Sequence, residues 1–179
     1  MKNSTKAILA KRVLHDVSAQ DYIDWAVDML VKGDDSPSLR ILAGLDQHNS
    51  FLEVESYFLR SIEELNIKKK VDKKIVIQDY AYEIAQQVIN GQFASLQLAV
   101  RALSRIWRCW DNYARYDEEL FYGLDMDGLE TWSELEYDLD SLLTNEFSYY
   151  YPFVTLENFD TIVKQETEKF TAKIASYNI

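Results

Sequence analysis

Apolar residues recur along most of the chain with the spacing of one face of an α-helix. Between residues 18 and 33, Tyr22, Trp25, Ala26, Met29 and Leu30 fall at i, i+3, i+4, i+7 and i+8. The same spacing predicts helices over about residues 4–14, 18–33, 36–44, 51–65, 72–90, 93–113, 129–143 and 155–174. No segment shows the two-residue alternation that would predict a strand. The pattern therefore predicts seven or eight helices.

Capping residues define several of these boundaries. Ser18 followed by Asp21, and Ser50 followed by Glu53, have the spacing of a capping box at a helix N-terminus. Gly33 stands where a helix commonly ends in a left-handed residue. In the helix over residues 93–113, the expected buried stripe consists of Leu96, Val100, Leu103, Trp107 and Trp110.

The composition favours an all-α fold. Only five glycines and two prolines occur in 179 residues, fewer than a β-sandwich or barrel needs for its turns. The connections are short, no linker divides the chain, and no repeat period is clear enough for a solenoid. We therefore predict a single domain over residues 1–179, a multi-helix bundle that could be arranged as stacked helix hairpins.

Cysteine usage and hydropathy predict a cytoplasmic location. Cys109 is the only cysteine, so no intrachain disulfide can form. No apolar run approaches the roughly 20 residues of a membrane span. The apolar run at residues 7–10 is broken by Lys11 and Arg12, which makes it too short for the core of a signal peptide.

The formal charge of −11 comes from one segment, residues 111–146. This segment contains a single basic residue, Arg115, whereas the rest of the chain carries equal numbers of acidic and basic residues. Its twelve acidic residues are Asp111, Asp117, Glu118, Glu119, Asp125, Asp127, Glu130, Glu134, Glu136, Asp138, Asp140 and Glu146. Such a segment repels nucleic acid and anionic membranes and attracts basic partners. Pairing with Arg101, Arg105 and Arg108, which share one helix face, would weaken this field.

Catalytic, metal and cofactor motifs are not found. His15 and His48 are the only histidines, and neither has a second His or Cys at ligand spacing. Cys109 lies on a strongly periodic helix, which favours a packed residue over a nucleophile. There is no nucleophile elbow, phosphate loop or dinucleotide fingerprint. We therefore predict no catalytic residue, no metal ligand and no cofactor, although an enzyme site without a motif is not excluded.

Two charged stretches resemble binding motifs only in part. Residues 124–134 place Asp125, Asp127 and Glu134 at positions three, five and twelve of a calcium loop. Gly123 at position one and Glu130 at position eight do not fit that loop, so a turn followed by a solvated helix is preferred. The five lysines within residues 68–74 are interpreted as a solvated connection between helices.

The acidic segment is interleaved with aromatic residues and is followed by an aromatic tail over residues 147–153. Aromatic anchors surrounded by charge are typical of protein interfaces. The candidate partner-binding residues are Asp117, Glu118, Asp125, Asp127, Glu130, Glu134, Tyr149, Tyr150 and Tyr151. The alternative is that the aromatic rings fill the core and the carboxylates form a solvated face.

One block of sequence resembles a known family. Residues 35–45 read Asp-Ser-Pro-Ser-Leu-Arg-Ile-Leu-Ala-Gly-Leu, and this block is similar to one shared by a family of small bacterial helical proteins. The match covers about residues 20–67 and is looser beyond them. It implies a bacterial, cytoplasmic, all-helical protein and carries over no functional residues. Within the block, Ser36 is expected to cap a helix that begins at Pro37, and Arg40 is a candidate anchor for a buried ion pair.

These observations support three functional hypotheses. The first is a module that binds a basic protein, such as an immunity protein that neutralises a nuclease-type toxin. The second is a metal- or small-molecule-dependent enzyme that uses Asp125, Asp127, Glu130 and Glu134. The third is a structural subunit, or a homo-oligomer, that associates through the aromatic tail.

Overall fold

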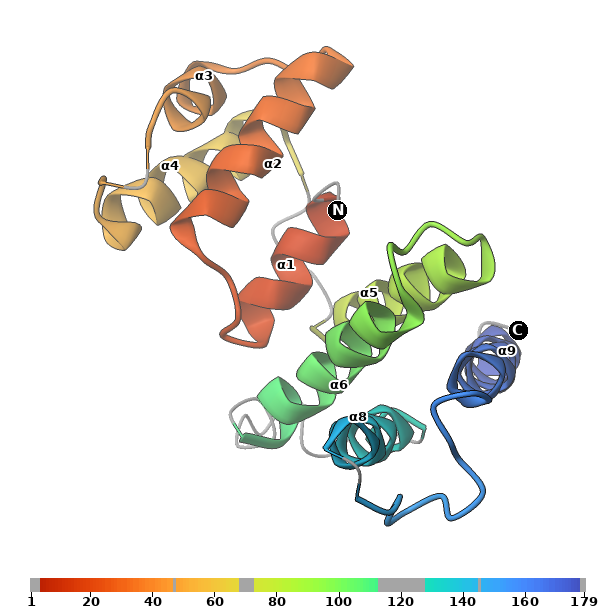
Figure 1. Ribbon diagram of the computed structural model, residues 1–179. Coiled ribbons are helices and arrows are strands. Elements are labelled where there is room, and N and C mark those ends of the chain that lie inside the picture. Colours follow the sequence, from red (N-terminus) through yellow and green to blue (C-terminus); the bar gives the residue numbers. More distant parts are fainter. Residues whose placement is uncertain (1–3, 47, 68–72, 113–127, 145, 178–179) are drawn as a thin grey trace. The chain divides into compact units, whose positions relative to one another are not determined.

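The computed structural model describes residues 4–46, 48–67, 73–112, 128–144 and 146–177, and these residues contain eight helices and no strand (Figure 1). The all-α multi-helix fold is thereby confirmed. In chain order the helices are α1 (Thr5–Val13), α2 (Ala19–Lys32), α3 (Pro37–Ala43), α4 (Phe51–Glu64), α5 (Lys73–Ile89), α6 (Leu96–Asn112), α8 (Glu130–Leu143) and α9 (Phe159–Tyr177). None of these helices is long and apolar enough to cross a membrane.

The chain divides into two compact units, Met1–Val76 and Ile77–Ile179, and α5 begins in the first and continues into the second. In the first unit, α2, α3 and α4 pack against one another. The aromatic centre of this unit is Phe58, which stacks on Tyr22 with 4.3 Å between ring centroids and meets Trp25 edge-on at 5.0 Å. All three rings are fully buried. The assignment of residues 1–179 to one domain stays a prediction.

Local hydrogen bonds form the predicted helix ends of the first unit. The Ser18 hydroxyl accepts from the Asp21 backbone N–H while the Asp21 carboxylate accepts from the Ser18 backbone N–H, which completes the capping box of α2. Ser50 caps α4 by accepting from the Glu53 N–H. The Glu53 carboxylate accepts from the Asn49 side-chain amide and not from the Ser50 backbone N–H. Of the two hydrogen bonds of the predicted capping box at α4, only the one accepted by the Ser50 hydroxyl is therefore found.

Replacing Gly33 with alanine is expected to destabilise the protein by about 1 kcal/mol. Gly33 ends α2 with φ of 96°, a left-handed conformation that strains any residue with a Cβ. The matched control is Gly44→Ala at the end of α3, where φ is −92° and an added Cβ would make only ordinary contacts. Urea denaturation of both variants measures the difference. Equal stability of the two variants would contradict the assignment of strain to Gly33.

Residues 35–45 form α3 and its attachment to α4. Ser36 caps the helix, Pro37 is its first residue, and Ser38 donates both its backbone N–H and its hydroxyl to the Glu64 carboxylate, at 2.9 and 2.7 Å. These hydrogen bonds lower the pKa of Glu64 below its ordinary value. The expectation of a buried ion pair at Arg40 was wrong. Arg40 pairs with Asp35, but its side chain is 69% exposed because it lies on the outer face of a short surface helix.

Asp21 makes the stability of the first unit depend on pH. Burial raises the pKa of Asp21, but hydrogen bonds from Lys11 at 2.6 Å and from Ser18 lower it by more, so the folded-state pKa lies below the ordinary value. A depressed folded-state pKa contributes stability above the unfolded pKa, and this contribution is lost as the pH falls through the folded value. We expect the Tm of the wild type to fall more steeply than that of Asp21→Asn between about pH 5 and about pH 2. Parallel Tm curves for the two proteins would contradict this.

Among the described residues, α6 and α8 form the most extensively packed helix pair of the second unit. The core of this unit buries Val100, Leu103 and Ile106 of α6 and Trp132 and Leu139 of α8, and α5 contributes further buried residues such as Ile77 and Ile84. The buried stripe predicted for α6 was partly wrong, since Leu96, Trp107 and Trp110 are only half-buried. The buried face of α6 is rotated towards Ile106, and this rotation brings Trp107 to the edge of the α6–α8 contact.

Candidate functional site

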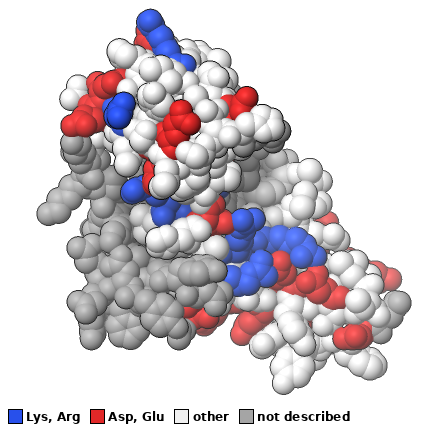
Figure 2. Space-filling model, turned by 90° about the vertical axis from the view of Figure 1, so that its left-hand side faces the viewer, with Lys and Arg blue, Asp and Glu red and all other residues white. Residues whose placement is uncertain are grey.

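Arginines of α6 neutralise part of the acidic segment. The Glu136 carboxylate, on a side chain that is 6% exposed, accepts from Arg108 at 2.5 Å, from Ser104 at 2.6 Å and from Arg101 at 3.3 Å. Arg101 also pairs with Asp140 at 2.5 Å. In the lower half of the face drawn in Figure 2, basic side chains lie directly beside acidic ones. The expected pairing of the arginine face with the acidic segment is thereby confirmed for Arg101 and Arg108.

Asp138 holds the aromatic tail against α8. Its carboxylate is fully buried and accepts from three consecutive backbone N–H groups, those of Tyr149 at 2.5 Å, Tyr150 at 2.9 Å and Tyr151 at 2.7 Å. Hydrogen bonds between backbone N–H groups and a carboxylate are stronger than those between neutral groups. A single side chain therefore fixes the backbone of the tail in a segment without regular secondary structure.

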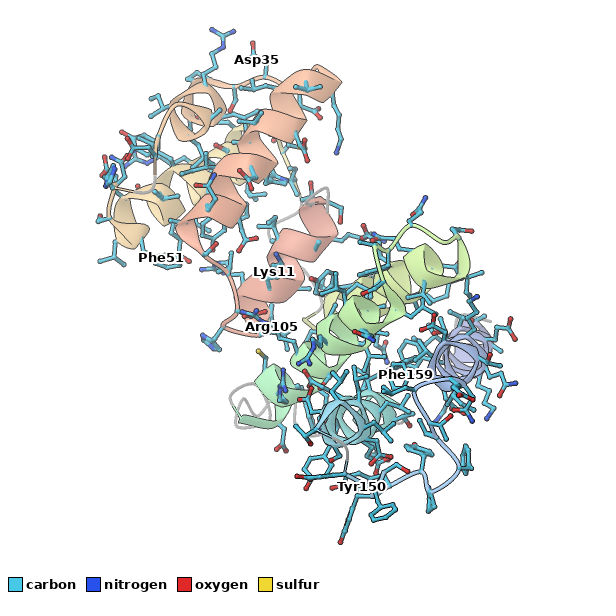
Figure 3. All side chains as sticks on the ribbon, viewed as in Figure 1. Lys11, Asp35, Phe51, Arg105, Tyr150 and Phe159 are labelled. Atoms are coloured by element: carbon cyan, nitrogen blue, oxygen red, sulfur yellow. The ribbon has the colours of Figure 1, made fainter. Side chains whose placement is uncertain are left out.

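Four exposed rings of this tail, together with the exposed ring of Tyr137 on α8, form what we call the aromatic surface: Tyr137, Phe147, Tyr149, Tyr150 and Phe153. Phe147 is 94% exposed and Tyr149 is 74% exposed, and the other three are also exposed. Tyr137, Tyr149 and Tyr150 contact one another edge to face, with centroid distances from 5.1 to 6.2 Å. In Figure 3 the Tyr150 side chain lies below α8, at the lower edge of the second unit. The alternative that the aromatic rings fill the core is therefore excluded for these five rings.

Glu134 and Tyr151 connect the tail to the first half of α8. The half-buried Tyr151 donates its hydroxyl to the Glu134 carboxylate at 3.0 Å. Burial, followed by this hydrogen bond, raises the pKa of Tyr151 to about 12. Tyr151 is therefore an uncharged donor at neutral pH, and it leaves the negative charge of Glu134 in place.

A pocket of about 370 Å³ opens between α6, α8 and the tail. Three aromatic rings line it, those of Trp107, Tyr137 and Tyr150. Its polar lining consists of Arg108, Ser133 and the four carboxylates of Glu130, Glu134, Glu136 and Asp140. The pocket therefore combines ring surface with an excess of negative charge.

The structure brings together five of the nine predicted partner-binding residues: Glu130, Glu134, Tyr149, Tyr150 and Tyr151. Asp117, Glu118, Asp125 and Asp127 lie outside the described residues. Sequence reasoning missed the organising roles of Asp138 and Glu136. The spacing of the arginines on α6 gave a usable signal for Glu136, whereas nothing in the pattern distinguishes Asp138 from its acidic neighbours.

The described residues show no arrangement suited to metal binding. No group of three or more His, Cys, Asp or Glu among them could hold a metal ion. His15 and His48 are exposed, and Cys109 is half-buried. Residues 124–127 of the calcium-like loop, which include Asp125 and Asp127, and residues 68–72 of the lysine run lie outside the described part of the chain. The enzyme hypothesis, which combines Asp125 and Asp127 with Glu130 and Glu134, stays a prediction.

Comparison with known proteins adds no family to this description. No protein-family model matches the chain, and no curated protein or solved structure matches it significantly. The function is therefore inferred from the residues of the site itself.

Proposed function

We propose that this chain is a protein-binding module whose aromatic surface binds a basic protein partner. The observation that carries this proposal is a set of exposed rings held on a fixed backbone, in a segment with no positive charge. Residues 129–163 contain eight acidic residues and no Lys or Arg. An immunity protein that neutralises a nuclease-type toxin is one example of such a module, since nucleases bind phosphate through basic surfaces.

Exposed aromatic rings in a cluster are a feature of binding surfaces. Isolated apolar residues are common on protein surfaces, whereas contiguous apolar patches rimmed by polar groups mark interaction sites. Tyr and Phe are enriched in interfaces because they bury a large area while few rotatable bonds are immobilised. Asp138 already orders the backbone of the tail, so binding would cost less conformational entropy than it would with an unrestrained loop.

The net negative charge around the aromatic surface indicates that the partner carries a positive charge. Of the eight acidic residues in 129–163, Glu136 and Asp140 are paired with arginines of α6, and Asp138 is buried against the tail. The remaining five are Glu130, Glu134, Glu146, Glu157 and Asp160. The field is thus weaker than the sequence count indicates, but it stays negative and would steer a basic partner towards the rings.

Photo-crosslinking in cells of the source organism tests the proposal. We would place the photoreactive residue p-benzoylphenylalanine at Phe147 or Phe153 of the aromatic surface. The matched controls place it at Val31 or Leu52, apolar positions of the first unit that are comparably exposed. We expect one basic protein to be crosslinked from Phe147 and Phe153 and not from the controls. Crosslinks only to acidic proteins, crosslinks to a second copy of this chain, or identical products from the controls would contradict the proposal.

The cellular setting is part of the same proposal. The similarity of residues 35–45 to the bacterial helical family supports a bacterial cytoplasmic protein. Recovery of the crosslinked complex from the cytoplasmic fraction is the expected result, and its recovery only from a membrane or extracellular fraction would contradict this part of the proposal.

A further inference from the structure

We infer that the pocket between α6, α8 and the tail receives one cationic side chain, an arginine or a lysine, of the basic partner. This inference rests on the proposed function and assigns a chemical role to a specific part of the surface.

Two walls of the pocket meet as a corner of aromatic rings. The Tyr137 and Tyr150 rings are 5.6 Å apart between centroids and nearly perpendicular, at 88°. Trp107, which lies on α6, adds a third ring to the lining. The negative face of an aromatic ring attracts a cation, most strongly for tryptophan and where the cation is partly desolvated. The walls therefore suit a positively charged group with an alkyl stem.

The net negative charge of the pocket also favours a cation. Its four carboxylates carry four negative charges, and the two arginines that pair with them, Arg101 and Arg108, carry two positive charges. The excess of two negative charges belongs to Glu130 and Glu134, which form no ion pair with any described Lys or Arg. These two residues are one helical turn apart on α8, so both carboxylates lie on one face of the helix.

Other occupants fit this lining less well. An anionic group would be repelled by the net charge of the pocket. An apolar side chain would remove water from Glu130 and Glu134 without supplying a hydrogen bond or a charge, which is costly. A guanidinium group suits both the aromatic rings and the carboxylates of the lining. It stacks on the rings, and its planar set of N–H groups donates hydrogen bonds to the carboxylates. An ammonium group supplies the same charge without the planar stacking, so we expect arginine to bind more tightly than lysine.

The test is an NMR titration of the ¹⁵N-labelled full chain with three small probes. The probes are the Nα-acetyl amides of arginine, of lysine and of citrulline, the last being a neutral analogue of arginine with nearly the same shape. We expect the arginine probe to shift the Trp107 indole signal and the amide signals of Glu134 and Tyr150, with a Kd of about 1–10 mM. The citrulline probe should bind at least about tenfold more weakly, because it lacks the charge.

Charge-neutralised variants locate the binding. In the double variant Glu130→Gln and Glu134→Gln, the Kd of the arginine probe should rise about tenfold, because the uncompensated carboxylates are gone. The matched control is the double variant Glu157→Gln and Asp160→Asn, which removes the same charge from exposed positions that do not line the pocket. Dispersed amide spectra confirm that both variants are folded. Equal binding of arginine and citrulline probes, or an equal loss of affinity in both variants, would overturn the inference.

The titration and the crosslinking experiment fail independently. A basic protein crosslinked from Phe147, together with no response of the Trp107 indole to the arginine probe, overturns the pocket inference alone. Specific binding of the arginine probe without any crosslinked basic protein supports the pocket and overturns the proposed function.

Discussion

Replacing Asp138 with alanine is expected to lower the free energy of unfolding by about 2–4 kcal/mol and to release the aromatic tail from α8. The wild-type carboxylate is buried and accepts from the backbone N–H groups of Tyr149, Tyr150 and Tyr151. In the variant these three donors have no partner unless the tail moves into water. The net loss is smaller than three full hydrogen bonds because the released N–H groups become hydrated. Urea denaturation gives the free energy, and hydrogen exchange of the three tyrosine amides reports the release.

Asp140→Asn is the matched control for Asp138. Asp140 lies on the same helix, but its carboxylate is exposed and pairs only with Arg101 among the described residues. Exposed ion pairs contribute little to stability, so Asp140→Asn should lower the free energy of unfolding by less than about 1 kcal/mol. The backbone amides of the tail should stay protected from hydrogen exchange. If Asp138→Ala left the exchange rates of residues 149–151 unchanged, Asp138 would not be what orders the tail.

Replacing Phe58 with alanine is expected to lower the free energy of unfolding by about 3–5 kcal/mol, because it removes a fully buried ring and leaves a cavity. The ring stacks on Tyr22 and meets Trp25 edge-on, so both neighbours lose their packing partner. A loss of this size is a large share of the roughly 5–15 kcal/mol by which domains are stable. The indole N–H of Trp25 donates to the Thr5 hydroxyl at 3.1 Å, and its NMR signal is a specific reporter of the first unit during urea denaturation.

Leu52→Ala provides the control on the same helix. Leu52 is 76% exposed, so its truncation should change the stability by less than about 0.5 kcal/mol. Similar losses for Phe58→Ala and Leu52→Ala would show that α4 does not bury the face assigned to it.

The helices and most of their ends could be predicted because they depend on residues that are close together in the sequence. Ser18 and Asp21 are three positions apart, and Gly33 acts through its own backbone conformation. The position of Trp107 was harder to predict. Rotation of a helix about its axis depends on what packs against it, and α6 turns Ile106 inward and leaves Trp107 half-buried at the pocket. The periodicity of apolar residues within α6 does not determine this rotation.

The candidate site was predictable only in part because its key contacts join distant residues. Charge and aromatic content indicated the segment, and five of the nine candidate residues come together there. The role of Asp138 depends on a tail that returns to α8 more than ten residues later, and no spacing rule covers such an irregular contact. Burial, which a sequence does not display, separates Asp138 from its exposed acidic neighbour Asp140.

The most direct test of the proposed binding surface is the association rate with the basic protein identified by crosslinking, measured over a range of salt concentrations. The comparison is between the wild type and a variant in which Glu130, Glu134, Glu146, Glu157 and Asp160 are replaced by their amides. We predict that the wild-type rate falls steeply with salt, and that the variant associates about tenfold more slowly at low salt with a flatter dependence. Equal, salt-independent rates for the two proteins would contradict binding through an acidic surface.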